Sequence, residues 1–376
     1  MNQMSKILEN EAAKSKYERV LKRSTSTAVL VLFAQGLSGC LRSDGSIDGP
    51  SISGVAFDGP LSRAKVFVDA NNNNLLDGSE DWTWTNFDGS FTLSTNATGP
   101  LVVVGTSETT DASSGASVDG LILTAPTGSS VISPATTVAK KIADDAIDAL
   151  GANPTEEQIQ AAIDNAYNQA AKAFGLSEAF TGAEASESLA TFNPFSGNTS
   201  SADAVAYAQA AAKVVAAANS VATAVSAAGG ADKGDTLLLA LNNIADQAAA
   251  AIGELNIDVG AIVNAVDTTN VVSADLSTSI SNAVARISTA IDSITDTNSD
   301  TAGDVLFVTQ SILAESVEIA AKGGSAANLE LLANATTDVA ALASTFVKIF
   351  GDSVGELSED NNWVRQKRIH LLGHCQ

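Results

Sequence analysis

The segment VFVDANNNNLLDGSEDW, residues 66–82, places carboxylate and amide side chains at regular intervals in one short stretch. Counted from its first aspartate, the calcium-loop pattern takes oxygen ligands at positions 1, 3, 5, 7, 9 and 12, with the seventh supplied by a backbone carbonyl. The sequence supplies these ligands as Asp69, Asn71, Asn73, the carbonyl of Leu75, Asp77 and Glu80. This spacing therefore predicts that the segment binds Ca²⁺.

The sixth position of this loop, where the pattern has glycine, is Asn74. Asparagine is among the few non-glycine residues that enter the left-handed region routinely, so the turn is still permitted. Two amides in place of carboxylates lower the charge of the site, which favours weak binding at near-millimolar calcium, and magnesium is a poorer fit because it keeps its waters. The alternative is an asparagine-rich turn without a metal.

Short β-rich runs flank the loop on both sides. They are residues 52–57, 64–69, 82–85, 90–95, 101–106 and 120–125. Asp88 and Gly89 stand between two of these runs and predict a hairpin. We expect residues 52–130 to form a small antiparallel β-sandwich.

This β region resembles the prealbumin-like modules of bacterial surface proteins, the collagen-adhesin B-type and carboxypeptidase-regulatory-like repeats. The matching positions are Asp69, Asn71, Asn73, Asp77, Glu80, Thr85, Gly89 and Phe91. The resemblance covers roughly residues 52–142 and implies an exported protein with a calcium-stabilised β module. Trp82 and Trp84 alternate onto one strand face, where they form a sugar-stacking platform, part of the core or a cover over the calcium hairpin.

From Ser133 onward the pattern becomes helical, with alanine-rich stretches and apolar residues at intervals of three and four. Ser133 with Pro134 predicts a helix start, and Thr155 with Gln158 predicts a capping box for the next helix. We expect residues 133–352 to form an antiparallel helical bundle, with a domain boundary near residues 129–134. The fold class is therefore α+β multidomain, a β-sandwich followed by an all-α bundle.

The N-terminal residues predict export through a lipoprotein signal. Residues 1–39 combine a basic leader with the apolar run AVLVLFA, which falls far short of the roughly 20 residues that cross a bilayer. LSGC then resembles the lipobox of bacterial lipoproteins, which implies that Cys40 is acylated and that the protein is anchored in the outer membrane or at the cell surface. Residues 40–51 form a flexible tether.

The C-terminal residues 353–376 read as an irregular tail that contains both histidines of the chain. A Ser-His-Asp or Cys-His centre is therefore not expected in the folded body, and no phosphate-binding or dinucleotide-binding motif occurs. The net charge of −23 disfavours nucleic acid as a partner. These observations predict a non-enzymatic surface lipoprotein with a structural, adhesive or partner-binding role; the alternative is a carbohydrate-binding or carbohydrate-processing lipoprotein.

Overall fold

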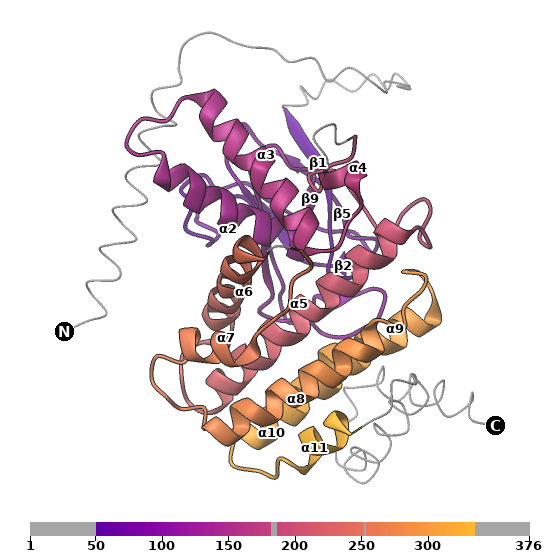
Figure 1. The fold of residues 1–376 in the computed structure, drawn as a ribbon. Helices are drawn as coiled ribbons and strands as arrows, with labels where there is room; N and C mark the ends of the chain where they lie inside the picture. The colour runs from indigo at the N-terminus through magenta and orange to yellow at the C-terminus, as the bar shows by residue number, and fades with distance from the viewer. Residues whose placement is uncertain (1–49, 182–185, 252, 335–376) are drawn as a thin grey trace.

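The computed structural model describes residues 50–181, 186–251 and 253–334 (Figure 1). The predicted signal segment 1–39, the acylation site Cys40, nearly all of the tether and the tail 353–376 lie outside the described residues, as does the end of the helical region. Within the described part of the chain, strands come first and helices follow, so the predicted α+β class is confirmed.

The strands form three small sheets. One sheet has the order β5-β1-β9, a second pairs β2 with β7, and a third has the order β4-β3-β6-β8. The neighbouring strands pair antiparallel except β1 and β9, which run parallel. The strand bounds are β1 Ser51–Ala56, β2 Leu61–Ser62, β3 Lys65–Val68, β4 Trp82–Trp84, β5 Ser90–Ser94, β6 Leu101–Val104, β7 Thr110–Asp111, β8 Ile122–Ala125 and β9 Val131–Ile132.

The helices cover the strands and extend away from them, with α5 running between the strand region and α8 (Figure 1). Between α9 and α10, the segment η1 is a short π-helix. The bounds are α2 Pro134–Ala149, α3 Glu156–Ala173, α4 Glu178–Thr181, α5 Ala202–Ala227, α6 Lys233–Ala250, α7 Val259–Val266, α8 Ala274–Ile291, α9 Asp300–Phe307, η1 Val308–Ile312, α10 Leu313–Ala321 and α11 Ala327–Ala333.

The helix starts at α2 and α3 follow from local hydrogen bonds. The Ser133 hydroxyl accepts the backbone N–H of Thr136, whose side chain bonds back to the Ser133 N–H, and Pro134 occupies the first helical position, where no N–H is needed. Thr155 and Gln158 form the same reciprocal box at α3. Both predicted caps are confirmed.

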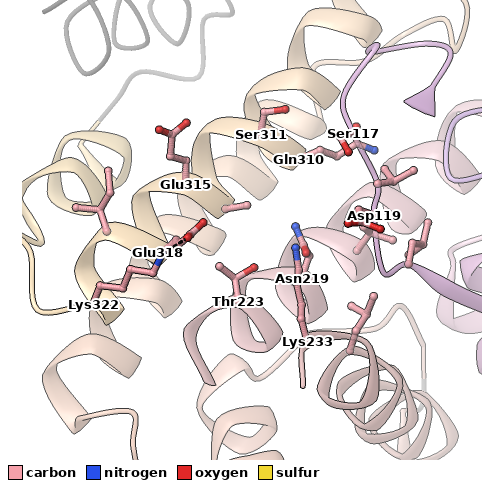
Figure 2. Close-up of a pocket in the computed structure, with 16 residues that line it drawn as sticks. Ser117, Asp119, Asn219, Thr223, Lys233, Gln310, Ser311, Glu315, Glu318 and Lys322 are labelled. Carbon is pink, nitrogen blue, oxygen red and sulfur yellow. Dashed lines mark hydrogen bonds and ion pairs between the residues drawn. The ribbon is translucent and has the colours of Figure 1, made fainter. Parts of the chain in front are cut away.

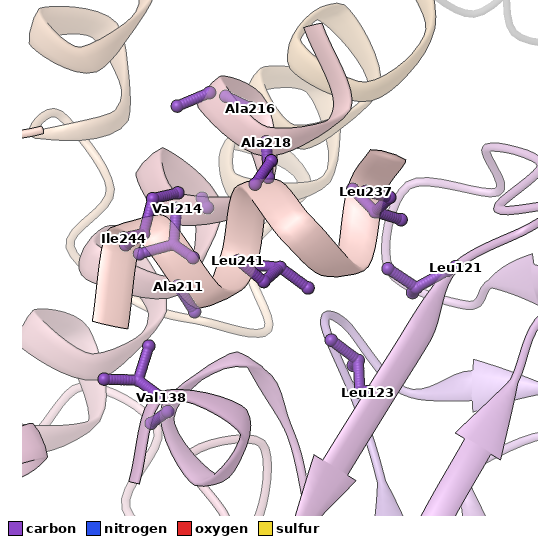
Figure 3. Packing of buried hydrophobic residues seen from close by; sticks show 14 of the residues in the cluster. Leu121, Leu123, Val138, Ala211, Val214, Ala216, Ala218, Leu237, Leu241 and Ile244 are labelled. Atoms are coloured by element: carbon purple, nitrogen blue, oxygen red, sulfur yellow. The ribbon is translucent and has the colours of Figure 1, made fainter. Parts of the chain in front are cut away.

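The hydrophobic core is continuous from the strands into the helices. Leu123 on β8, Val138 on α2 and Leu241 on α6 belong to one buried cluster (Figure 3). Ser129 and Ser133, at the predicted domain boundary, are themselves buried. The boundary near residues 129–134 stays a prediction, but an exposed linker does not mark it.

The predicted hairpin at Asp88 and Gly89 is wrong. The turn itself is present, because the Asn86 N–H donates to the Ser90 carbonyl at 2.8 Å and Gly89 has φ of 77°. Its two strands nevertheless enter different sheets, since β4 pairs with β3 whereas β5 pairs with β1. The turn is local, but each strand takes its hydrogen-bonding partner from a segment earlier in the chain.

Candidate functional site

The predicted calcium loop is the connection from β3 to β4. Asp69 follows the buried end of β3 and is itself fully buried, with its N–H donating to the Pro100 carbonyl at 3.0 Å. Asn72 and Asn74 adopt φ of 58° and 59°, so the loop turns twice through the left-handed region. The left-handed conformation predicted for Asn74 is confirmed.

Asp69 organises the first half of the loop. Its Oδ1 accepts the backbone N–H of Asn73 at 3.1 Å, and its Oδ2 accepts that of Asn74 at 2.7 Å. The side-chain oxygen of Asn71 also accepts the Asn73 N–H at 3.1 Å, and the Asn73 oxygen accepts the N–H of Leu75 at 2.8 Å. These hydrogen bonds curl the backbone, so that the side chains of alternate residues point to the inside of the loop.

Asp77 and Glu80 close the second half. Asp77 Oδ2 accepts the Nδ2–H groups of both Asn71 and Asn73, the latter at 3.2 Å. Glu80 Oε1 accepts the N–H of Ala70 and Oε2 accepts the N–H of Asp77, each at 3.0 Å. The five predicted side-chain ligands therefore belong to one hydrogen-bonded network.

The donor set of this loop fits calcium by composition. It offers carboxylate and amide oxygens, and the Leu75 carbonyl accepts no hydrogen bond from the described residues. Asn71 and Asn73 direct amide N–H groups at Asp77, and a half-turn of each amide would direct oxygens there instead. Within the described residues, however, no three His, Cys, Asp or Glu side chains converge as a metal-binding group. Calcium coordination thus requires these amide oxygens.

Burial raises the pKa of the Glu80 carboxyl, and the charges of Asp69 and Asp77 raise it further, whereas the N–H bonds from Asp77 and Ala70 oppose the shift. The negative charges of Asp69 and Asp77 therefore act on the Glu80 carboxylate across the loop. A bound divalent ion would supply the missing positive charge.

Lys140 connects the loop to helix α2. Its ammonium donates to Asn72 Oδ1 at 2.9 Å and to Asp144 Oδ2 at 2.6 Å, although the side chain is almost wholly buried. The loop is thereby held against the first helix after the strands, an arrangement that loop spacing alone does not predict.

The two tryptophans beside the loop lie on the surface, on edge strand β4. Trp82 is 44% exposed and Trp84 is 43% exposed, and their ring centroids lie 5.3 Å apart at 90°. The Lys65 ammonium lies 4.9 Å from the Trp82 ring centroid and 5.3 Å from that of Trp84. The interpretation of the pair as core is therefore wrong, because the face of β4 that carries both rings is open to solvent.

A buried polar cluster at the junction of strands and helices was not anticipated. Gln310, in the π-helix η1, donates one amide group to Asp58 Oδ2 at 3.0 Å and to Asp111 Oδ2 at 2.8 Å. Its amide oxygen accepts the Ser114 hydroxyl at 2.7 Å. Burial and the Asp111 charge raise the pKa of Asp58 well above its ordinary value. The residues of this polar cluster are far apart in the chain, so the spacing of residues along the sequence does not predict the cluster.

Comparison with protein-family models, with curated proteins and with solved structures found no match. Of the described helices, α5 alone has the length and hydropathy of a membrane span, and 72% of its most apolar window is buried inside the protein. Burial of that kind is ordinary for a core helix of a soluble protein, so it carries little weight as evidence for a membrane span. The loop and the neighbouring tryptophans are thus interpreted from their own geometry.

Proposed function

We propose that the protein is a non-enzymatic exported lipoprotein with a surface structural, adhesive or partner-binding role, whose β region is stabilised by Ca²⁺ in the loop of residues 69–80. The observation that carries the proposal is the single network joining Asp69, Asn71, Asn73, Asp77 and Glu80, with the Leu75 carbonyl open beside it. Bound calcium would supply positive charge among the three carboxylates. The chain itself contributes the wound backbone that holds these oxygens together.

The proposal includes the finer architecture. We take the sheets of residues 51–132 as a prealbumin-like sandwich and the later helices as a bundle that packs against it. Support comes from the loop pattern, from the strand arrangement around a shared apolar core and from the helix contacts with β8. In this arrangement the loop leaves the end of β3 and returns as β4, which pairs alongside β3.

The calcium experiment uses the full-length protein and two neighbouring acidic residues. Calorimetric titration should show calcium binding, and calcium should raise the melting temperature by an amount that follows the ratio of free calcium to Kd. Glu80→Gln removes a charged ligand and should abolish both effects. Asp81→Asn removes the adjacent exposed carboxylate and should leave both intact. Absence of heat and of a melting shift at millimolar calcium would reduce the loop to an asparagine-rich turn.

The membrane anchor is a separate part of the proposal and depends on Cys40, which lies outside the described residues. Cys40 modified with a two-tailed acyl anchor and an amide-linked acyl chain would exceed the two lipid signals that stable membrane attachment requires. Cys40→Ser should yield an unprocessed precursor that no longer enters the detergent phase. Unchanged detergent partitioning of this variant would refute the anchor without affecting the calcium proposal.

Carbohydrate binding is the second candidate function, and the exposure of Trp82 and Trp84 favours it. Exposed tryptophan rings provide flat apolar faces for sugar C–H groups. A glycan array should give signals that disappear in Trp82→Ala and Trp84→Ala. Phe87→Ala is the matched control, because Phe87 is 76% exposed nearby but follows the strand. An empty array, or equal loss in the control, would exclude a tryptophan-dependent glycan site.

A further inference from the structure

A cavity of about 450 Å³ lies where the strand region meets the helices, remote from the calcium loop in the sequence. Its walls come from residues 117–121, from α5, from the start of α6 and from η1 with α10 (Figure 2). This volume is within the range of small-molecule sites, roughly 300–1,000 Å³. It encloses enough space for a molecule the size of an amino acid.

The floor of the cavity is largely apolar. Val118, Leu121, Val215 and Leu237 are buried there. Thr223 is also buried, and its hydroxyl has no hydrogen-bond partner among the described residues. A helical threonine normally bonds to the carbonyl one turn back, as Thr309 does to Val305 at 2.8 Å. A buried hydroxyl without a partner costs free energy, so Thr223 is a polar group that a ligand can satisfy.

The cavity also has a lysine without an ion-pair partner. Lys233 makes no salt bridge within the described part of the chain, whereas Glu318 is already paired with Lys322. Burial lowers the pKa of the Lys233 ammonium, and the more distant charges of Glu318 and Asp119 partly offset that effect. In Figure 2 Lys233 lies across the cavity from Glu318 and Lys322. Its ammonium is therefore available to an anionic group.

The other charges decide what kind of molecule carries that anionic group. Acidic side chains outnumber basic ones in the lining: Asp119, Glu315 and Glu318 against Lys233 and Lys322. A simple anion would meet Lys233 but would be repelled by the carboxylates, and a simple cation would leave Lys233 unused. A zwitterion satisfies both, with its carboxylate at Lys233 and its ammonium at the acidic side of the cavity.

The helix that forms one wall is irregular at the cavity. The π-helix η1 contributes Gln310 and Ser311 to the lining, and π-helical turns occur frequently at functional sites. Gln310 uses its own side chain to hold Asp58 and Asp111. The hydrogen bonds from Gln310 to Asp58 and Asp111 thus hold the π-helix in place where it lines the cavity.

We propose that this cavity binds a free amino acid or a similarly small zwitterion, with Lys233 holding the carboxylate, the acidic side chains of the lining facing the ammonium and Thr223 donating a hydrogen bond from the floor. The apolar floor takes the side chain. This site is independent of the calcium loop, so either proposal can fail without the other.

The first experiment is calorimetric titration of the full-length protein with a panel of L-amino acids that includes leucine. The controls are isocaproate, which lacks the ammonium of leucine, and isoamylamine, which lacks its carboxylate. At least one amino acid should bind at least about tenfold more tightly than its two single-charge analogues. Absence of binding by the whole panel at millimolar concentration, or equal binding of an analogue, would overturn the proposal.

The second experiment uses three variants with the amino acid that binds. Lys233→Met should weaken binding at least about tenfold, and Lys172→Met, on the exposed surface of α3, should not. Thr223→Val removes an unpartnered hydroxyl, so it should weaken binding while the melting temperature of the free protein stays the same or rises. Unchanged affinity in either Lys233→Met or Thr223→Val would overturn the assignment of the site.

Discussion

The Lys140 ammonium lies 2.9 Å from the side-chain oxygen of Asn72, and this hydrogen bond joins the candidate calcium loop to helix α2. Lys140 is buried and is also paired with Asp144 one helical turn later. The next residue, Lys141, forms its ion pairs with Asp145 and Asp246 at the surface. Of these two adjacent lysines, Lys140 thus makes the buried tertiary contact, whereas Lys141 makes only surface ion pairs.

Lys140→Met should lower the free energy of unfolding by about 2 kcal/mol, because it leaves a half-buried carboxylate and an amide oxygen without their donor. Urea denaturation measures this loss. Lys141→Met should cost at most about 1 kcal/mol, since surface ion pairs contribute little. Hydrogen exchange at the Asn73 and Asn74 amides should quicken in Lys140→Met alone. Equal losses in the two variants would contradict a fixed loop–helix contact.

Asn74→Ala should destabilise the protein by about 1 kcal/mol, because alanine is strained at φ of 59°. Asn74→Gly should be close to neutral, since glycine enters that region without strain. Gly78→Ala is the control within the same loop: an added methyl group there meets nothing within 4 Å. Thermal denaturation in chelator compares the three, and a loss in Gly78→Ala as large as that in Asn74→Ala would argue against a conformational cause.

Asp58→Asn should change the pH dependence of stability. Because burial raises the Asp58 pKa in the folded state, ionisation favours unfolding, and stability falls as pH rises from the unfolded pKa of about 3.9 toward the folded value. Asparagine does not ionise, so the variant should gain on the wild type as pH increases. Urea denaturation across this pH range measures the difference.

Asp88→Asn is the control for the Asp58→Asn measurements, because its effect on stability should change with pH in the opposite direction. Hydrogen bonds from Ser90 lower the Asp88 pKa, so its stabilising contribution is present above the unfolded pKa and lost as pH falls. This variant should therefore lose ground to the wild type at neutral pH and match it in acid. A parallel pH profile for the two aspartate variants would contradict the assignment of Asp58.

The continuous core predicts that the strand and helical regions unfold together. Calorimetry of the full-length protein should show one main transition, because the buried residues of β8 and α2 pack against each other. Gln310 adds a buried polar link between the two regions. Two well-separated transitions would instead support independent domains divided near residues 129–134.

Several local features could be predicted from the sequence because their causes lie within a few residues. Ser133 and Thr155 cap helices through backbone groups three positions away, and Asn74 turns the loop with its own left-handed backbone. The short β-rich runs located β1, β3, β4, β5, β6 and β8 to within a few residues. Oxygen spacing likewise selected the loop, whose side chains do form one network, although calcium in it stays a prediction.

The sequence by itself thus determined the α+β composition, the helix caps and the conformation of the loop, since each depends on short-range backbone geometry. Only the tertiary structure decided which sheet each strand joins, that Trp82 and Trp84 face solvent, and that Gln310 contacts Asp58 across 252 positions. The cavity around Lys233 also exists only after folding, because its walls come from segments distant in the chain. Such contacts depend on how whole elements pack, and residue spacing along one segment contains no record of that packing.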